Sequence, residues 1–297
     1  MSPDFIRLSD VMLRYGAGTV ALDHTTLGIA EGDFVALVGP SGCGKSTILK
    51  LVAGLLRPSA GVVIAGGREV GAVGTRPAAG AHASASPRLR IGLAFQNPTM
   101  LPWLTIRDNV MIPLKIVEPF RQDFRRKRRG EYTDRVEALL AQVGLKGFGE
   151  KRPWQLSGGM LQRASLCRAL IHEPELLLLD EPFGALDQFT REELWDIMQK
   201  LWMDRRPTVL LVTHDLRESA YLANRICVMS SRPGRILETR DVDFARPRTL
   251  EGSYAPEFAA LVQQLRMRIA DARRDGDATP PAAAPVTATP RIGEVAA

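Results

Sequence analysis

A glycine-rich segment between two apolar stretches constrains this chain more than any other feature. The segment GPSGCGKST follows the apolar run Phe34 to Val38 and precedes a helix-like segment, Ile48 to Leu56. Glycines in such a turn let the backbone N–H groups point inward, where they can bind a polyphosphate. Lys45 is placed to reach the β- and γ-phosphates, and the hydroxyl of Ser46 is placed to ligate Mg²⁺. Alone, the segment predicts nucleotide binding by Gly39, Pro40, Ser41, Gly42, Cys43, Gly44, Lys45, Ser46 and Thr47.

A second glycine-containing segment, LSGGMLQR, begins at Leu156. Ser157 is a natural helix N-cap, Gly158 and Gly159 allow close backbone approach, and an apolar-periodic helix follows through Leu170. The segment has no lysine with which to hold a nucleotide by itself. It predicts either a second anion site or only an ordinary helix cap.

Two further apolar runs end in polar residues that suit phosphate chemistry. Leu176 to Leu179 predicts a strand buried on both faces, and it ends in Asp180 and Glu181. Val209 to Val212 predicts another strand, and His214 follows it. A carboxylate pair beside a buried strand is costly without a cation. The alternatives are a solvated pair at a strand end and a structural histidine.

The order of these motifs resembles that of the ATP-binding cassette (ABC) ATPases. In this family two subunits pair head to tail, and each ATP lies between the phosphate loop of one subunit and the signature segment of the other. The resemblance implies that Asp180 holds Mg²⁺, that Glu181 is the general base for the attacking water, and that His214 contacts the γ-phosphate. It also implies that LSGGMLQR binds the phosphate of a partner's ATP. The implied activity is ATP hydrolysis, with ATP and Mg²⁺ as cofactors.

Weaker matches complete the implied site. Gln96 ends the strand-like segment Ile91 to Phe95 and matches the family's Q-loop glutamine, which meets Mg²⁺ and the attacking water. Tyr15 is placed like the aromatic residue that stacks on adenine, although an ordinary core or edge-strand tyrosine is the alternative. Ala185 to Asp187 matches the D-loop, which lines the dimer interface. The resemblance thus adds as nucleotide ligands Tyr15, Ser157, Gly158, Gly159 and Asp187, as metal ligands Ser46, Gln96 and Asp180, and as catalytic residues Glu181, His214 and Gln96.

The resemblance covers about residues 5–245 and implies an α/β fold. The expected architecture is a P-loop NTPase (RecA-like) core with a mostly parallel sheet, an antiparallel β subdomain and an inserted α-helical subdomain. Apolar residues from Phe258 to Ile269 recur at helical spacing and predict a C-terminal amphipathic helix. The Ala-, Pro- and Thr-rich end predicts disorder, and the Gly-, Ala- and Ser-rich stretch 66–87 predicts a flexible surface loop. The expected divisions are 1–96 and 158–245 for the core, 97–157 for the helical subdomain, 246–275 for the C-terminal helical extension and 276–297 for the tail.

Composition favours a subunit without membrane spans of its own. The chain has 297 residues, of which 45% are apolar, yet no apolar run approaches the roughly 18 residues that a span requires. If the chain serves a transporter, we therefore expect the pore to be another chain. We also expect no secretory signal, because the N-terminus leads directly into a strand pattern. The three cysteines have neither metal-ligand nor redox spacing, which suits a reducing cytoplasm. Cys43 lies inside the phosphate loop, and we expect its alkylation to block ATP binding.

Several segments look like importer ATPases of the nitrate, sulfonate and taurine type. They are FQNPTMLPW at Phe95 to Trp103, the signature with Met160 where most cassettes carry Gln, and SRPGRI at Ser231 to Ile236. The implied partners are a second copy of the chain, integral-membrane permease subunits and, indirectly, an extracytoplasmic solute-binding protein, with no nucleic acid. The implied location is the cytoplasmic face of the inner membrane. A soluble ABC ATPase acting on nucleic acid or ribosomes usually carries two cassettes, a coiled coil or zinc modules, none of which is evident, and an exporter ATPase shares every catalytic motif.

A basic run contributes to the net charge of +6. It extends from Arg121 to Arg129. Such a run is most often a solvated helix face or loop. Contact with anionic lipid head groups comes next, at about 1 kcal/mol for each basic residue near the surface. Nucleic-acid binding comes last, because no aromatic residue is interleaved among the five consecutive basic residues from Arg125 to Arg129.

Overall fold

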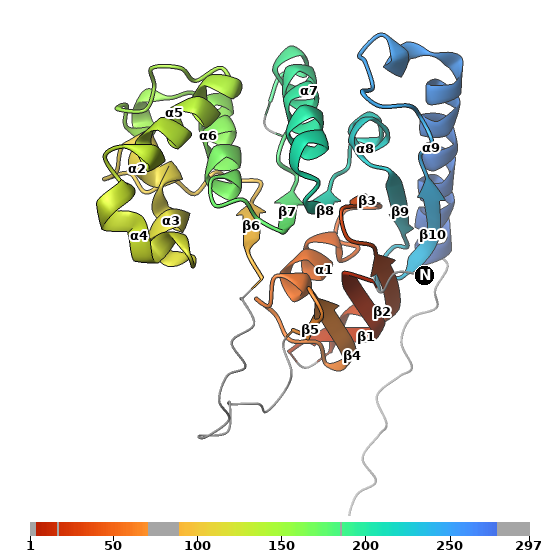
Figure 1. Cartoon of the computed structure of the whole chain (residues 1–297). Coiled ribbons are helices and arrows are strands. Elements are labelled where there is room, and N and C mark those ends of the chain that lie inside the picture. The colour runs from red at the N-terminus through yellow and green to blue at the C-terminus, as the bar shows by residue number, and fades with distance from the viewer. Residues whose placement is uncertain (1–3, 17, 71–88, 185, 278–297) are drawn as a thin grey trace, which may run out of the picture.

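A six-stranded, mostly parallel sheet organises the chain (Figure 1). The computed structural model describes residues 4–16, 18–70, 89–184 and 186–277, and the side chains of 275–277 are outside this description. The strands follow the order β10, β9, β3, β8, β7, β6, and β10 alone is antiparallel to its neighbour. The expected mostly parallel sheet is therefore confirmed. Its strands are β3 (Phe34–Val38), β6 (Ile91–Ala94), β7 (Leu176–Asp180), β8 (Thr208–Val212), β9 (Arg225–Met229) and β10 (Ile236–Asp241).

The central strands are apolar throughout because both faces of the sheet are covered. In β3, Phe34, Ala36 and Val38 join the core on one face, whereas Val35 and Leu37 join the core on the other. Side chains alternate across a strand with period two, so a strand between two cores contains no polar position. This is the physical reason for the continuous apolar runs of the sequence.

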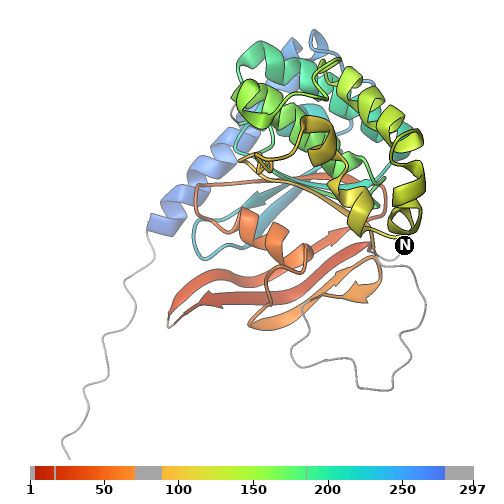
Figure 2. The ribbon, with the colours of Figure 1, turned by 90° about the vertical axis from the view of Figure 1, so that its left-hand side faces the viewer.

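An antiparallel sheet forms the second layer, as expected. Its order is β2, β1, β4, β5, and helix α1 (Lys45–Val52) lies between it and the parallel sheet (Figure 2). The helix begins inside the loop motif and ends before Leu56, the limit expected from the sequence, because Gly54 adopts a left-handed φ of 71°. The strands of this sheet are β1 (Ile6–Tyr15), β2 (Thr19–Ile29), β4 (Ala60–Ala65) and β5 (Arg68–Glu69).

A group of helices is inserted between β6 and helix α6 (Gly158–Leu170). It stands to one side of the sheet, at the left of Figure 1. In the basic run, Arg126 and Lys127 pair with Asp123, and Arg128 pairs with Asp108. Lipid contact by this run stays a prediction. The inserted helices are α2 (Ile106–Val110), α3 (Ile112–Ile116), α4 (Phe120–Lys127), α5 (Glu131–Gln142) and the 3₁₀ turn η1 (Pro153–Gln155).

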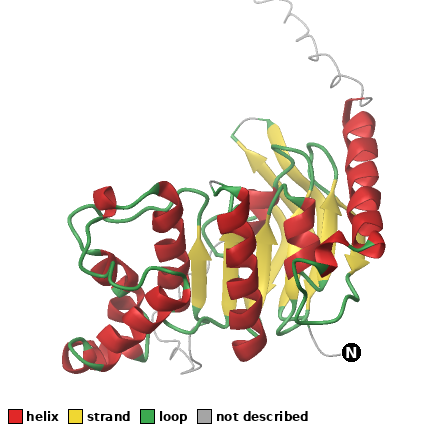
Figure 3. Cartoon of the chain, turned by 90° about the horizontal axis from the view of Figure 1, so that it is seen from above, coloured by secondary structure: helices red, strands yellow, loops and turns green. Residues whose placement is uncertain are grey.

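The remaining helices complete the fold (Figure 3). Helices α7 (Gln188–Arg205) and α8 (Leu216–Leu222) follow β7 and β8. After the turn η2 (Gly252–Tyr254), the long helix α9 (Pro256–Asp277) packs on α8 and β9. The expected C-terminal amphipathic helix thus exists, with Phe258, Leu261 and Leu265 buried. Within the described residues, no helix is long and apolar enough to span a bilayer.

Two predicted segments fall largely outside the described residues. Most of the predicted surface loop 66–87 lies within the undescribed stretch 71–88. The predicted tail lies outside the description from residue 278 onward. Helix α9 ends at Asp277 and thus includes the first two residues of the tail expected from the sequence.

Candidate nucleotide-binding site

The loop between β3 and α1 forms a cradle around the side chain of Lys45. The Lys45 ammonium donates hydrogen bonds of 2.9 Å to the carbonyl oxygens of Gly39 and Pro40, and the residue is 7% exposed. These carbonyls belong to the loop itself, so they orient the ammonium without neutralising its charge. The charge stays available to an anion.

Glycine is required in this loop by backbone conformation and by packing. Gly42 and Gly44 have φ values of 74° and 103°, which L-residues with a side chain rarely adopt. A Cβ added to Gly44 would lie 2.7 Å from Cδ2 of Leu22 and 3.1 Å from the Ala21 carbonyl oxygen. A side chain at Gly44 would therefore collide with atoms of β2. From the sequence alone, we expected the glycines to be needed so that the phosphate could approach the backbone.

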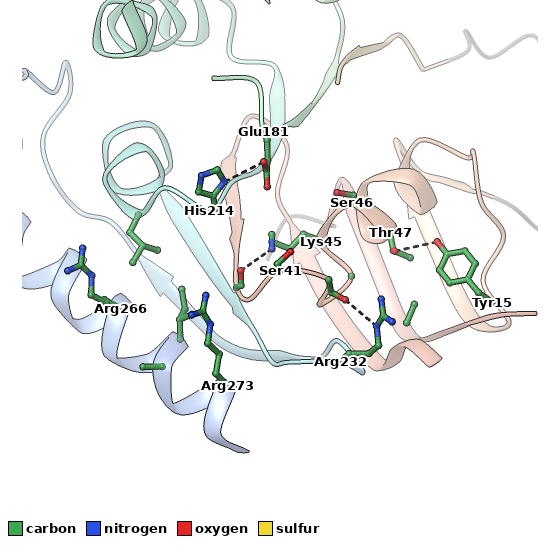
Figure 4. Close-up of a pocket in the computed structure, with 17 residues that line it drawn as sticks. Tyr15, Ser41, Lys45, Ser46, Thr47, Glu181, His214, Arg232, Arg266 and Arg273 are labelled. Atoms are coloured by element: carbon green, nitrogen blue, oxygen red, sulfur yellow. Dashed lines mark hydrogen bonds and ion pairs between the residues drawn. The ribbon is translucent and has the colours of Figure 1, made fainter. Parts of the chain in front are cut away.

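A cavity of about 650 Å³ opens beside this loop (Figure 4). This volume is within the range of roughly 300–1,000 Å³ that is usual for small-ligand sites. Tyr15 lies at one side, 44% exposed, with its hydroxyl 3.4 Å from Oγ1 of Thr47. Of the residues predicted from the sequence, the cavity is lined by Tyr15, Gly39, Ser41, Gly42, Gly44, Lys45, Ser46, Thr47, Glu181 and His214.

The hydroxyl of Ser46 meets the first strand-end carboxylate. It donates a 2.8 Å hydrogen bond to Oδ1 of Asp180. Burial raises the pKa of Asp180, and the hydrogen bond from Ser46 partly offsets this effect. Magnesium is usually bound by one or two carboxylates together with substrate phosphates and water. The two oxygens fit such an ion, although no cluster of three or more His, Cys, Asp or Glu side chains within the described residues could hold a metal.

The second carboxylate holds together the three residues predicted to be catalytic. Oε2 of Glu181 accepts a 3.0 Å hydrogen bond from Nε2 of Gln96 and lies 3.4 Å from Nδ1 of His214. Glu181 itself has a φ of 47°, which is uncommon for a residue with a side chain, and its N–H bonds to the Val212 carbonyl at 2.8 Å. The backbone turn after β7 thereby directs the carboxylate toward the segment that follows β8.

The signature segment lies away from this cavity in the same chain. Ser157 caps α6 by accepting a 3.3 Å hydrogen bond from the Met160 N–H, as its sequence position predicted. Asp187 caps α7 in the same way through the Thr190 N–H at 3.0 Å. Neither residue lines the cavity. The same holds for Gly158 and Gly159, and Ala185 is outside the described residues.

Two members of the loop motif also do not line the cavity. Pro40 uses its carbonyl to bind Lys45, and Cys43 is fully buried. Burial raises the pKa of the Cys43 thiol, and the nearby Lys45 lowers it in part. The thiol is thus packed into the protein beneath the loop, so its contribution to a nucleotide site would come from its backbone.

The cavity also contains residues that the sequence reasoning did not assign to it. Arg232 comes from the segment between β9 and β10, and Arg266 and Arg273 come from α9. In the sequence, the segment SRPGRI indicates only a resemblance to one group of importer ATPases. The spacing of Arg266 and Arg273, two helical turns apart, placed them on one helix face but gave no indication of which partner that face meets. The other additions are Ala21, Leu216, Ile269 and Ala270.

These features define a P-loop ATPase. They are a phosphate-binding loop, a strand-end aspartate that accepts a hydrogen bond from the serine of that loop, and a glutamate next to it that contacts Gln96 and His214. Comparison with known proteins narrows this class. The ABC transporter family profile matches residues 22–184. A Brucella abortus protein named as an ATP-binding protein is 43% identical, over 86% of this chain and 90% of its own. The aliphatic sulfonates import ATP-binding protein SsuB of Bacillus licheniformis is 41% identical, over 83% of this chain and 86% of its own.

A solved structure agrees with these relatives. The ATP-binding cassette MJ0796, in a dimeric post-hydrolysis state bound to ADP and Pi, has a TM-score of 0.65 and 30% identity, over 81% of this chain and all of that chain. The chain belongs to the ABC transporter family. It is an ATP-binding and ATP-hydrolysing cassette, as its motifs predicted.

Proposed function

We propose that this chain is the ATPase subunit of an importer and that Glu181 is its general base. The observation that carries the second point is the position of the Glu181 carboxylate between Gln96 and His214, at the cavity that also contains Lys45. A general base needs one oxygen free to accept a proton while the other atoms are oriented. Oε2 of Glu181 makes the contacts with both Gln96 and His214, which leaves Oε1 to accept the proton.

The other residues then have defined roles. The N–H groups of the loop and the Lys45 ammonium bind the β- and γ-phosphates, and Tyr15 stacks on adenine. Asp180 and Ser46 would hold Mg²⁺, with Gln96 as a further oxygen ligand. The bound ion would neutralise charge on the phosphates and fix their orientation. His214 contacts the γ-phosphate and keeps Glu181 in place.

The signature residues act on a second copy of the chain. Ser157, Gly158 and Gly159 do not line their own cavity, which is what a site for a partner's nucleotide requires. The MJ0796 cassette is described as a dimer, which supports this arrangement. Asp187 would lie at the same interface. Replacement of the usual Gln by Met160 leaves the Ser157 hydroxyl and the glycine N–H groups for the phosphate.

Relatives named for aliphatic sulfonate import favour import over export. The partners would be membrane permease subunits and, through them, an extracytoplasmic solute-binding protein. The transported solute would be small and of the sulfonate, nitrate or taurine type. The subunit would lie on the cytoplasmic face of the inner membrane. Nucleic acid is not among the proposed partners.

Two variants test the catalytic assignment. Lys45→Ala should abolish nucleotide binding, because the loop loses its positive charge. Glu181→Gln should retain binding but lose hydrolysis and accumulate an ATP-bound dimer, measured by phosphate release and by light scattering. Normal phosphate release by Glu181→Gln would refute the general-base assignment.

A purification tests the importer assignment. Tagged Glu181→Gln protein is isolated with ATP from detergent-solubilised native membranes, and the proteins that accompany it are identified by mass spectrometry. Recovery of a multispanning permease together with a solute-binding protein supports an importer. Recovery of ribosomes or nucleic-acid enzymes without a permease would support the soluble class of ABC ATPases instead.

A further inference from the structure

Helix α9 forms part of the wall of the nucleotide cavity. Arg266, Ile269, Ala270 and Arg273 are the residues of α9 that line it, and their spacing places them on one face of the helix. In the view of Figure 4, Arg273 and Arg232 stand on opposite sides of the phosphate loop, and Arg266 lies farther along α9. The cavity therefore has basic residues beyond the loop lysine.

The position of this wall is fixed by contacts on its other sides. Leu265 and Ala272 of α9 are buried. The hydroxyl of Ser231 donates a 3.0 Å hydrogen bond to the carbonyl oxygen of Ala272. This bond joins α9, beside Arg273, to the segment that carries Arg232. The arginines of the wall thus belong to two segments that are held together.

The charges of the wall are not neutralised by the protein. Within the described residues, the side chains of Arg266 and Arg273 make no hydrogen bond or ion pair, and the side chain of Arg232 donates one hydrogen bond of 3.3 Å, to the Gly42 carbonyl oxygen. Two other arginines of α9 differ, because Arg268 lies 3.4 Å from Glu238 and Arg274 lies 3.8 Å from Asp271. Unpaired arginines therefore occur on the face of α9 that meets the cavity, whereas these two paired arginines lie elsewhere on the helix.

The lining of the cavity also has a strong excess of positive charge. Of the described lining residues, Glu181 is the one acidic side chain, against Lys45 and the three arginines of the wall. Like charges gathered without counter-charges repel one another, so such a cluster is stabilised by an anion. Guanidinium groups match phosphate oxygens in geometry as well as in charge.

We propose that Arg232, Arg266 and Arg273, the three arginines of the wall, attract and bind the phosphate oxygens of the incoming nucleotide. The inference rests on the proposed function, because it assumes that the cavity is where the nucleotide binds. Helix α9 would thereby make the C-terminal extension part of the nucleotide site. The arginines of the wall should therefore raise the affinity more for a nucleotide whose phosphates carry more negative charge.

Matched double variants test the proposal in the full-length Glu181→Gln protein. Arg266→Ala/Arg273→Ala removes two charges from the wall, and Arg268→Ala/Arg274→Ala removes two from other faces of the same helix. The affinities for ATP, ADP and adenosine are measured by titration calorimetry at low and high salt, at protein concentrations where light scattering shows a monomer. The wall variant should weaken ATP binding by about three- to tenfold at low salt, less for ADP and not for adenosine. High salt should reduce the difference.

The controls separate the possible outcomes. Equal ATP affinities for the two double variants would overturn the proposal while leaving the loop assignment intact, because Lys45→Ala tests that assignment separately. A wall variant that binds ATP normally as a monomer but no longer dimerises would also overturn it, since the arginines would then bind carboxylates of a second copy. The variant Arg266→Lys/Arg273→Lys keeps the two positive charges, so it should recover much of the ATP affinity that Arg266→Ala/Arg273→Ala loses. If the alanine variant had lost affinity only because helix α9 was disrupted, restoring the charges would not be expected to recover it.

Discussion

The clearest test of the energetics of this fold concerns the buried carboxyl of Glu218. This residue lies on α8, four positions after His214 in the sequence, and is 2% exposed. Burial, and then the Asp215 carboxylate, raise its pKa from 4.5 to about 8, partly offset by the Thr213 and Trp195 side chains. At neutral pH the folded protein therefore holds a proton that the unfolded chain has released.

The sign of the effect on stability follows from this difference. Because the folded pKa is the higher one, the contribution of this proton is fully present below the unfolded value of 4.5 and is lost as pH rises through about 8. One pKa unit corresponds to about 1.36 kcal/mol, so the whole shift is worth at most roughly 5 kcal/mol. Between about pH 5.5 and 7.5 the free energy of unfolding should fall by roughly 2.4 kcal/mol from this group alone.

The substitution Glu218→Gln removes the titration and nearly preserves the shape. Urea unfolding of the wild type and of the variant is measured without nucleotide at pH 5.5, 6.5 and 7.5. With each increase of one pH unit, the free energy of unfolding of the variant should rise relative to that of the wild type by about 1.2 kcal/mol. Glu251→Gln, at an exposed position, controls for the substitution itself. A difference between wild type and Glu218→Gln that stays constant across this range would refute the reasoning.

Two further predictions concern buried groups of opposite kinds. Iodoacetamide should label Cys43 slowly in the folded protein, because the thiol is fully buried and burial raises its pKa, and complete labelling should abolish ATP binding by displacing the loop. Mass spectrometry and ATP titration of the labelled protein check this, and undiminished ATP affinity would contradict it. Arg248→Met should lower the free energy of unfolding by on the order of 3 kcal/mol, because Arg248 donates from Nη1 to the carbonyl oxygens of Ala220, Tyr221 and Ala223 at 2.6–3.0 Å. Urea unfolding measures the loss, and a loss no larger than that of a surface substitution would show that water replaces these bonds.

Much of the fold was predictable because its signals are local. The apolar run Phe34 to Val38 became a strand with the expected bounds, and the helix of the signature segment ends at Leu170 as expected. Both signals depend only on neighbouring residues. The end of α1 was placed too late because the effect of Gly54 depends on its backbone conformation, which apolar periodicity does not report.

The site was predictable to the extent that its residues belong to recognisable motifs. The resemblance named Gln96, Glu181 and His214 together as catalytic residues. In the structure Oε2 of Glu181 lies 3.0 Å from Nε2 of Gln96 and 3.4 Å from Nδ1 of His214. The basic wall was not predictable in this way. The sequence around Arg273 indicates only that this residue belongs to a helix. Its position in the cavity beside the phosphate loop depends on where α9 packs.

The geometry of the segment that carries His214 also depends on a residue outside the motifs. Arg191 of α7 donates from Nη2 to the Leu186 carbonyl oxygen at 3.0 Å and from Nη1 to Oδ2 of Asp215 at 3.0 Å. Asp215 in turn caps α8 and immediately follows His214. A charge-assisted hydrogen bond to a partly buried carboxylate is among the stronger contacts available to a protein. Arg191 therefore fixes the backbone before α7 relative to the histidine after β8, so the positions of the predicted interface segment and of the predicted catalytic residue are not independent.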